Sequence, residues 1–485
     1  MRTDTDEAAA DDGEALYMSA KKIYPQNFHG TFRRIKWIVL FITLGIYYFT
    51  PFIRWDRGPN APDQAVMIDM AGRRAYFFWI EIWPQEVYYL TGLLIMAALV
   101  LFLMNAIAGR IWCGYLCPQT VWTDLFLAVE RWTEGDRRAR IALDKAPWTG
   151  EKIARRTAKH FLWLMIAWWT GGAWVLYFGN APDMIRELAT FQAPMMSYIF
   201  IGVLTFTTYA LAGHMREQVC IYMCPWPRIQ AALTDEWALN VTYKHDRGEP
   251  RGSLKQNRKL AAEGKPAGDC VDCGQCVVAC PTGVDIRDGL QLGCIQCGLC
   301  IDACDSVMTK VNKPTGLIGY DTDVNMERRE KGLAPLFRFI RPRTLIYAVL
   351  IAIVGGAMVF QLSTRELQGV TALHDRNPVF VALSDGGVRN GFTVHIKNKR
   401  SMPRRFLLTT DGLPVASRLE VIGSSDVVKD NGVEVFVGPD TVRDLRMLVF
   451  ADKMANPPEQ VPLTIRIVDV ETGEEATATD FFRFR

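Results

Sequence analysis

Eight of the 12 cysteines in this chain form the pattern C-x2-C-x2-C-x3-C twice in succession, between Cys270 and Cys304. This is the spacing of bacterial ferredoxins with two 4Fe–4S clusters, in which the fourth cysteine of each run binds the other cluster. The pattern predicts one cluster on Cys270, Cys273, Cys276 and Cys304, and a second on Cys294, Cys297, Cys300 and Cys280. A pair of zinc sites is the alternative, but zinc sites do not need the third cysteine of each run.

Two clusters indicate an electron relay. The chain has no G-x-G-x-x-G run after a strand, which is the pattern typical of dinucleotide binding. We therefore expect the electrons to arrive from another protein or from a small reductant.

The other four cysteines form two copies of C-x3-C-P, in IWCGYLCPQ (Ile111–Gln119) and CIYMCPWPR (Cys220–Arg228). Residues four apart lie on one face of a helix, and the residue before a proline is disfavoured in a helix. We expect each helix to end at its second cysteine and the two ends to lie side by side. The resulting group of four thiols, which we call the thiol cage, comprises Cys113, Cys117, Cys220 and Cys224.

Three interpretations of the thiol cage stay open. Copper is one, since Cu(I) prefers thiolate and thioether ligands, and Met223 and His214 are further donors nearby. A third iron–sulfur cluster is another, and thiols that only pack are the last. His160 and His214 flank the same membrane surface, either as interfacial polar residues or as haem ligands.

Five apolar runs approach the roughly 20 residues needed to span a bilayer. They are Trp37–Ile53, Val87–Ile107, Phe161–Phe178, Met195–Gly213 and Thr344–Gln361, of which the first and third are short. Lys and Arg are dense before the first run and between the second and third, whereas Arg186 alone lies between the third and fourth. Because basic residues favour the cytoplasm, we expect the N-terminus and all cysteines inside, where thiols stay reduced, and the C-terminal tail outside.

The tail contains short alternating runs rich in β-branched residues, such as GFTVHIKNKR and VPLTIRIVDV, separated by Gly, Asn and Asp. This pattern is typical of a sandwich of about seven strands. It contains no cysteine and no evident catalytic group, so a docking domain is the expectation. The net charge of +3 gives no indication of nucleic-acid binding.

The fold class is therefore a multidomain membrane protein with a helical bundle, a ferredoxin-like insert and an all-β sandwich. We predict the following segments in chain order: 1–23 disordered acidic tail; 24–228 four membrane helices with both C-x3-C-P motifs; 229–265 basic cytoplasmic linker; 266–310 double 4Fe–4S domain; 311–343 cytoplasmic linker; 344–361 fifth helix; 362–485 periplasmic β-sandwich.

Several stretches together resemble the CcoG/FixG/RdxA family over nearly the whole chain. They are the two C-x3-C-P motifs, GRIWCGYLCPQTVW (Gly109–Trp122) above all, then the ferredoxin insert, KPTGLIGYDT (Lys313–Thr322) and WIEIWPQE (Trp79–Glu86). A last span and an outer β-sandwich complete the resemblance.

The resemblance implies an inner-membrane protein of bacteria that assists assembly of a cbb-type cytochrome oxidase. It implies reduction of Cu(II) to Cu(I), with copper handled by the four cysteines of the thiol cage and electrons carried by the eight ferredoxin cysteines. It also implies an Ig-like C-terminal domain and copper-delivery and assembly proteins as partners. The electron donor and the oligomeric state are open, a homodimer being one option. The alternatives are an electron relay linked to quinol or to a partner protein, with a third cluster, and a non-catalytic assembly factor.

Overall fold

The computed structural model describes residues 22–485 except 60, 401, 423–426 and 430–431, so nearly all of the predicted tail 1–23 lies outside the described residues. The chain divides into two compact units. We call the first, which includes Leu90–Leu176 and Met184–Val354 and holds every cysteine, the cysteine unit. The second, comprising Pro51–Tyr89, Tyr177–Asp183 and Gly355–Arg485, is the sandwich unit.

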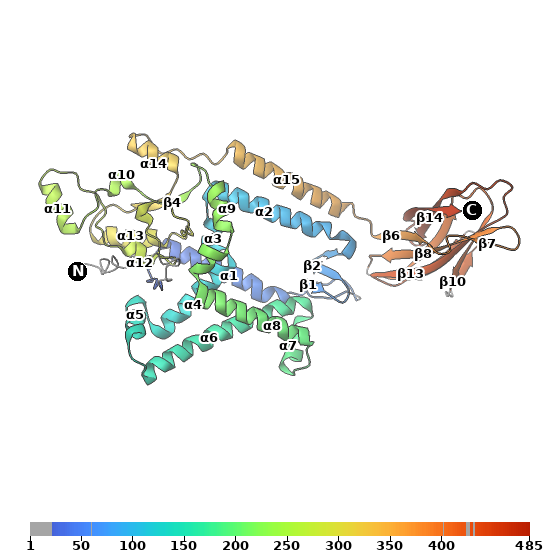
Figure 1. Ribbon diagram of the computed structural model, residues 1–485, viewed down its shortest axis with the longest axis horizontal. Helices are drawn as coiled ribbons and strands as arrows, with labels where there is room; N and C mark the ends of the chain where they lie inside the picture. Colours follow the sequence, from blue (N-terminus) through green and yellow to red (C-terminus); the bar gives the residue numbers. More distant parts are fainter. Residues whose placement is uncertain (1–21, 60, 401, 423–426, 430–431) are drawn as a thin grey trace, which may run out of the picture. The chain divides into compact units, whose positions relative to one another are not determined.

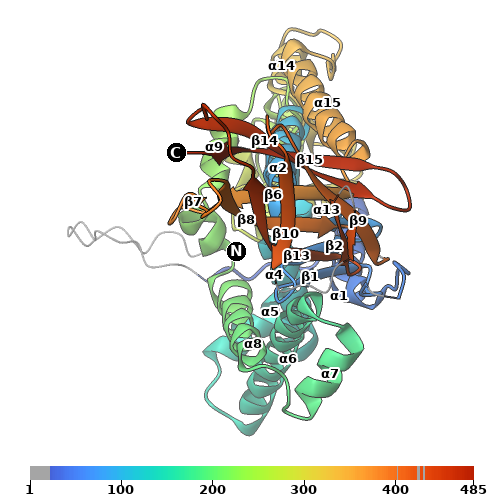
Figure 2. The same ribbon diagram turned by 90° about the vertical axis from the view of Figure 1, so that its right-hand side faces the viewer.

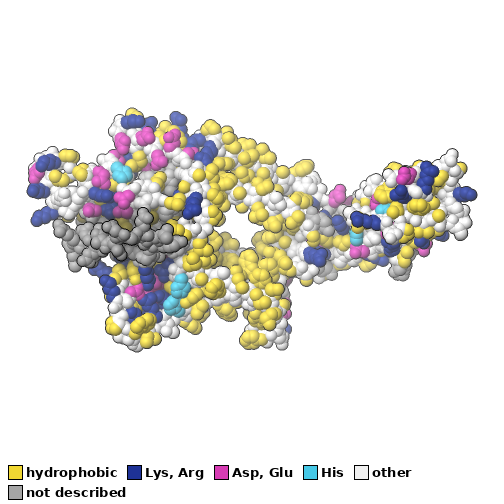
Figure 3. All heavy atoms as spheres, viewed as in Figure 1, with side chains coloured by type: hydrophobic (Ala, Val, Ile, Leu, Met, Phe, Trp, Pro, Cys, Tyr) yellow, Lys and Arg dark blue, Asp and Glu magenta, His cyan; other side chains and the backbone are white. Residues whose placement is uncertain are grey.

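Five helices in the described chain are long and apolar enough to cross a membrane, as predicted. These spans contain α1 (Thr31–Phe49), α2 (Tyr88–Ala108), α6 (Gly150–Val175), α8 (Met195–Thr208) and α15 (Pro342–Ser363), shown in Figure 1. Short helical turns extend three of them, so the first, third and fourth spans are Thr31–Phe52, Gly150–Phe178 and Met195–Met215. No more than 39% of any of these apolar windows is buried, so their side chains are free to contact lipid. Hydrophobic side chains cover the visible face of α15 in Figure 3.

The first and third spans are longer than predicted, at 22 and 29 residues. Each helix begins earlier, in a basic segment that hydropathy excludes. Two cations there are buried and paired: Lys36 Nζ lies 3.0 Å from Asp124 Oδ2, and Lys159 Nζ lies 2.8 Å from Glu134 Oε1. A hydropathy profile scores Lys and Arg as polar whether or not they are buried and paired, and therefore ends the predicted span before them. The prediction that these two spans are short is wrong.

Helices α6 and α8 pack side by side in both views of the chain (Figures 1 and 2). Gly171 permits this approach, because a Cβ at that position would lie 2.9 Å from the Ile201 carbonyl oxygen. α8 continues into a π-helical segment, η4 (Tyr209–Met215), and a second π-helical segment, η5 (Val219–Met223), follows. The shorter helices are α3 (Ile111–Tyr115), α4 (Pro118–Glu134), α5 (Arg137–Lys145), α7 (Ala181–Ala189) and α9 (Trp226–Leu233).

The ferredoxin part is closed by an antiparallel pair, β4 (Asn240–Tyr243) and β5 (Ile318–Asp321), so its fold reaches beyond residues 266–310. The remaining elements are α10 (His245–Gly248), α11 (Leu254–Ala262), α12 (Gln275–Ala279), η6 (Ile286–Asp288), α13 (Leu299–Lys310) and α14 (Asp323–Glu330). The two cysteine runs share one backbone form. Gly274 and Gly298, at equivalent positions before α12 and α13, have φ of 64° and 72°, a conformation that glycine adopts without a Cβ clash.

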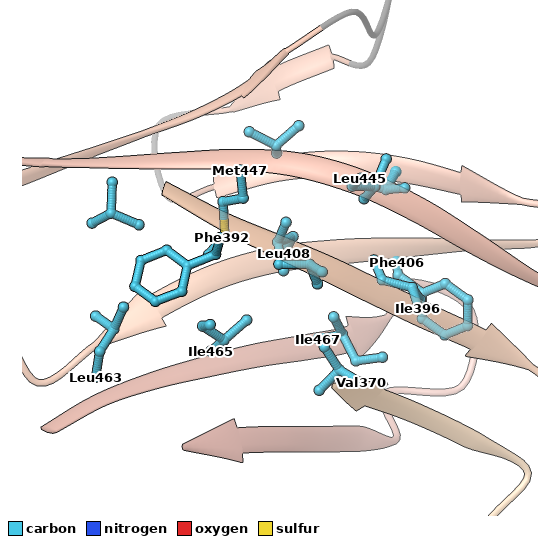
Figure 4. Close-up of a cluster of buried hydrophobic side chains, with 14 of the residues drawn as sticks. Val370, Phe392, Ile396, Phe406, Leu408, Leu445, Met447, Leu463, Ile465 and Ile467 are labelled. Carbon is cyan, nitrogen blue, oxygen red and sulfur yellow. The ribbon is translucent and has the colours of Figure 1, made fainter. Parts of the chain in front are cut away.

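The sandwich contains two five-stranded sheets, in the orders β10-β13-β8-β6, with β7 paired to β8, and β11-β12-β9-β14-β15. Their strands are β6 (Gln368–His374), β7 (Val381–Ala382), β8 (Val388–Asn398), β9 (Arg404–Asp411), β10 (Ser417–Ile422), β11 (Val427–Lys429), β12 (Gly432–Val437), β13 (Thr441–Ala451), β14 (Gln460–Asp469) and β15 (Glu475–Arg483). Phe392, Leu408, Met447 and Ile465 fill the core between the sheets (Figure 4). The all-β prediction is confirmed, but the described strands exceed the expected seven.

A small sheet of β1 (Val66–Asp69), β2 (Arg74–Phe77) and β3 (Ile80–Ile82), followed by η2 (Pro84–Glu86), belongs to the same sandwich unit. Arg74 forms an ion pair with Asp440, and Lys399 Nζ lies 2.8 Å from Glu86 Oε1. These ion pairs join the segment between the first two spans to the sandwich.

Candidate iron–sulfur and thiol site

The eight ferredoxin cysteines line two cavities, four to each. One cavity is lined by Cys280, Cys294, Cys297 and Cys300, together with apolar side chains such as Ile286. The other is lined by Cys270, Cys273, Cys276 and Cys304, together with Tyr243 and Arg287. These are the two sets that the spacing predicts, so the crossed arrangement of the two runs is present in the fold.

The chemistry of these donors fits 4Fe–4S clusters, which are held by four thiolates each. Burial raises the pKa of Cys276 to about 11 and the pKa values of Cys294 and Cys304 to about 12. In each of these three cases neighbouring thiols add to the effect. Without a metal centre these buried sulfurs are therefore neutral thiols, and binding of a positively charged iron core would release their protons.

The two C-x3-C-P motifs have matching local structures. The backbone N–H of Cys117 donates to the Trp112 carbonyl at 2.9 Å, and that of Cys224 donates to the Val219 carbonyl at 2.8 Å, each five residues back. Both cysteines then adopt extended backbone angles, φ −61° and ψ 127° for Cys117 and φ −81° and ψ 122° for Cys224. A helical segment thus ends just before the second cysteine in each motif, and the motifs are structural repeats.

The fold gathers the four cysteines of the thiol cage. Burial first, and then the neighbouring thiols of Cys117, Cys220 and Cys224, raise the pKa of Cys113 to about 12. The pKa of Cys220 is raised to about 11, again by burial first and then by its neighbouring thiols. Cys113 Sγ donates to Gln230 Oε1 at 3.2 Å, whereas the Met223 side chain is 56% exposed.

Within the described chain, no three His, Cys, Asp or Glu side chains converge tightly enough to hold a single metal ion. The cysteines that line the two cluster cavities also do not converge this tightly, because a cubane holds its ligands farther apart than a single ion does. In this respect the thiol cage resembles the two ferredoxin sets. A single copper ion held by three or four of these thiols would therefore require them to move closer together.

The thiol cage packs directly on the second cysteine run. Cys113 belongs to one hydrophobic cluster with Ile295, Cys297 and Leu299. A Cβ at Gly114 would lie 2.8 Å from the Ile295 carbonyl oxygen, and the Tyr115 hydroxyl donates to the Cys297 carbonyl at 2.9 Å. The fold thus brings the backbone of the first C-x3-C-P motif into contact with the second cysteine run.

Sequence reasoning missed several residues of this contact. Gly114 and Tyr115 stand between the two cysteines of the first motif, and Arg110 precedes it. The Arg110 amide donates to Gln296 Oε1 at 2.7 Å, and its guanidinium donates to the Leu292 carbonyl at 2.6 Å. A glycine inside a cysteine motif was the available signal for a close backbone approach.

His214 lies with His160 in a separate cavity, and no cysteine is among the described residues that line it. The two imidazole rings are stacked, with centroids 5.9 Å apart and planes inclined by 15°. Cys220 lines a neighbouring cavity that shares Arg216 and Glu217 with this one.

Membrane-spanning helices, a ferredoxin fold and buried cysteine sets together define an iron–sulfur electron-transfer protein of the membrane. Protein-family models agree: a "4Fe-4S dicluster domain" matches residues 215–323, a "4Fe-4S binding domain" matches 89–133, and an "IG-like fold at C-terminal of FixG" matches 358–485. The second of these ranges contains Cys113 and Cys117.

Characterised relatives extend over most of the chain. Nitrogen fixation protein FixG of Rhizobium meliloti is 50% identical over 90% of this chain and 88% of its own. Proteins RdxB and RdxA of Cereibacter sphaeroides are 51% and 47% identical, covering 81% and 94% of this chain and 83% and 94% of their own. The chain therefore belongs to the FixG/RdxA family, as the sequence motifs predict.

Among solved structures, a FixG-related protein from Vibrio parahaemolyticus is 19% identical and covers 24% of this chain and 97% of its own, with a TM-score of 0.20.

Proposed function

We propose that this protein passes single electrons from two 4Fe–4S clusters to copper at the thiol cage, reducing Cu(II) to Cu(I) for assembly of a cbb-type cytochrome oxidase. The packing of Cys113 against Cys297 carries this proposal. It connects the ligand set of one cluster to the cage through a contact of buried, apolar residues.

Each set of residues has a separate task in this scheme. The eight ferredoxin cysteines hold the clusters, which store and release one electron at a time when bound. Gly114 and Tyr115 hold the first C-x3-C-P motif against the backbone of Cys297. The thiol cage binds Cu(II), which gains one electron, and the resulting Cu(I) is the ion that soft sulfur ligands prefer.

The direction of the chain in the membrane is part of the proposal. The dense basic segments around the cysteine unit support a cytoplasmic position for the ferredoxin part. The sandwich unit would then lie in the periplasm and contact copper-delivery or assembly proteins there.

A third cluster in the thiol cage is the second candidate. Two observations favour it: a 4Fe–4S family model spans Cys113 and Cys117, and no single-ion site is present among the described residues. In that case the cage is one more step in an electron relay, and copper is not its substrate.

Metal analysis of the protein purified without oxygen separates the two candidates. About eight iron atoms per chain, with copper bound after addition of Cu(II), supports copper reduction; about twelve iron atoms supports the third cluster. The variant Cys220→Ser/Cys224→Ser should lose cupric reduction by the dithionite-reduced protein but keep both ferredoxin clusters. Tyr222→Phe, which changes an exposed residue of the same motif, is the matched control. Unchanged reduction in the double variant would exclude the cage as the copper site.

A further inference from the structure

A cavity of about 320 Å³ lies between the ends of α6 and η4, and it is lined by Trp163, Glu130, Arg216 and both His160 and His214 among others. This volume suits a single-ring organic ligand. We propose that the cavity binds the headgroup of a membrane quinol and that the quinol is the electron donor. This inference rests on the proposed function in one respect: the proposed function names copper as the acceptor of the electrons.

Aromatic and imidazole rings form the wall of this cavity. The Tyr209 hydroxyl lies 2.9 Å from His160 Nδ1, and Trp163 stands perpendicular to both imidazoles, at 87° and 88°. A Cβ at Gly213 would lie 3.1 Å from the Trp163 ring. Flat rings and polar edges of this kind suit a quinol, which stacks through its ring and donates from two hydroxyls.

The backbone around the cavity departs from regular helix. η4 is π-helical, a form that is rare and frequent at functional sites. It ends at Arg216, whose φ of 42° is unusual for a residue with a side chain. The Arg216 guanidinium holds this conformation by donating to the Gly213 carbonyl at 2.8 Å and to Glu130 Oε1 at 3.1 Å. Strain of this kind persists only where surrounding contacts maintain it.

Most charges around the cavity, among them Glu130, Lys159, Arg156 and Arg216, are already paired, which favours a neutral ligand. Arg216 pairs with Glu130, Lys159 with Glu134 at 2.8 Å, and Arg156 with Asp144. Although burial raises the pKa of Glu130, Arg216, Arg140 and Lys159 outweigh it and lower the pKa to about 2. Glu130 is therefore ionised, and a phosphate or a nicotinamide dinucleotide would have to displace a carboxylate from its cations.

The cavity also lies where a lipid-soluble ligand can reach it. It adjoins the ends of two apolar spans, Gly150–Phe178 and Met195–Met215. Phe161, Leu164 and Phe206 on these helices are 62%, 45% and 71% exposed. Their apolar surface would contact the isoprenoid tail of a quinol, while its headgroup occupies the polar end.

A route leads from this cavity to the cysteines. The adjacent cavity shares Arg216 and Glu217 with it and is lined by Cys220 and Thr282. Thr282 Oγ1 lies 3.3 Å from Cys280 Sγ, in the ligand set of the second cluster. Gln119 ties α4 to this region, because its side-chain amide donates to the Leu211 carbonyl at 2.8 Å.

The proposed step is balanced by the quinol alone. A quinol loses two O–H protons and two electrons and becomes a quinone. The protons pass through His160 and His214 to water, and the electrons pass singly to the cysteine-bound centres. Two copper ions are reduced for each quinol oxidised.

Photo-crosslinking tests the binding site directly. The full chain in lipid nanodiscs is labelled with an azido-quinone, digested and examined by mass spectrometry. We expect the label on peptides from α6 and η4, with competition by unlabelled decylubiquinone. Labelling spread over all five spans without competition would overturn the proposal.

Reduction kinetics test the donor. Anaerobic decylubiquinol should bleach the iron–sulfur absorbance, and His160→Phe or His214→Phe should slow this by at least about tenfold. His29→Gln, which changes an exposed histidine of the same unit, should leave the rate unchanged. Iron content and bleaching by dithionite report that each variant has folded. Equal rates in both cavity variants and the wild type would overturn the proposal.

The two proposals fail separately. If quinol leaves the clusters oxidised while the dithionite-reduced protein reduces Cu(II), the quinol site is excluded and the copper function stands. If quinol reduces the clusters and Cu(II) is not reduced, the donor is supported and the proposed substrate is excluded.

Discussion

Gly114 is the residue at which the first C-x3-C-P motif approaches the ferredoxin part most tightly. A Cβ there would lie 2.8 Å from the Ile295 carbonyl oxygen and 3.1 Å from Cys297 Cα, and backbone atoms cannot move aside as a flexible side chain does. We predict that Gly114→Ala destabilises the cysteine unit by about 1–3 kcal/mol. It should also slow electron transfer from the reduced clusters to the cage.

Thermal unfolding and stopped-flow oxidation of the reduced protein by Cu(II) check this prediction. Gly45→Ala in α1 is the matched control, because no atom lies within 4 Å of its added Cβ. If the two variants have the same stability and the same rate of oxidation by Cu(II), the close contact at Gly114 does not contribute to electron transfer.

The two cluster sets give a second prediction at this scale. Cys304→Ser and Cys270→Ser should remove the same cluster, although Cys304 belongs to the second run in the sequence. Cys280→Ser should remove the other one together with Cys294→Ser. Electron paramagnetic resonance of the reduced variants distinguishes the two centres, and loss of different signals in Cys304→Ser and Cys270→Ser would contradict the crossed pairing.

Spacing along the chain groups three cysteines of each run by local geometry, and the ferredoxin pattern assigns the fourth ligand from the other run. Spacing was not sufficient for Gly114, Arg110 or the cavity at His160 and His214. Their partners are far away in the sequence, and only the folded chain determines which backbone or ring they meet.

At the level of secondary structure, the start of α1 depends on the ferredoxin part. Asp302, in α13, accepts from the backbone N–H of Arg33 at 2.8 Å and of Phe32 at 3.2 Å. A carboxylate at this position satisfies free donors and interacts favourably with the positive end of the helix dipole.

We predict that Asp302→Ala lowers the free energy of unfolding of the cysteine unit by about 1 kcal/mol, the usual cost of losing a helix cap. Hydrogen exchange at the first turn of α1 should increase. Asp302→Asn keeps an oxygen acceptor and should recover most of the loss. Unchanged exchange in the alanine variant would show that the cap is dispensable.

The predictions of helices succeeded where hydropathy alone determines the helix, and they failed where buried ion pairs extend a helix into a basic segment. Five apolar helices were predicted because hydropathy alone identifies them. The early starts of α1 and α6 were missed because buried Lys36 and Lys159 are neutralised by distant carboxylates.

Considered as a whole, the molecule keeps its cysteines in one of its two compact units. All 12 cysteines belong to the cysteine unit, whereas the sandwich unit has a core of apolar side chains and a surface of ion pairs. Family membership and domain order were predictable from motifs distributed along the chain. The inclusion of β1, β2 and β3 in the sandwich unit was not, because it depends on ion pairs between segments hundreds of residues apart.

That association gives a prediction about pH. Glu81 and Asp440 lie beside Arg74, and burial first and Asp440 second raise the pKa of Glu81 from 4.5 to about 7. The folded sandwich unit therefore holds a proton that the unfolded chain has already lost between those values. The contribution of this proton to stability is complete below pH 4.5 and is lost as the pH rises through about 7.

We predict that protection of β2 and β3 from hydrogen exchange, corrected for intrinsic rates, falls over this interval. Glu81→Gln, which stays neutral, should make the protection independent of pH there, and Glu474→Gln at an exposed ion pair should keep the wild-type profile. A profile that rises over the same interval would contradict the assignment of this proton to Glu81.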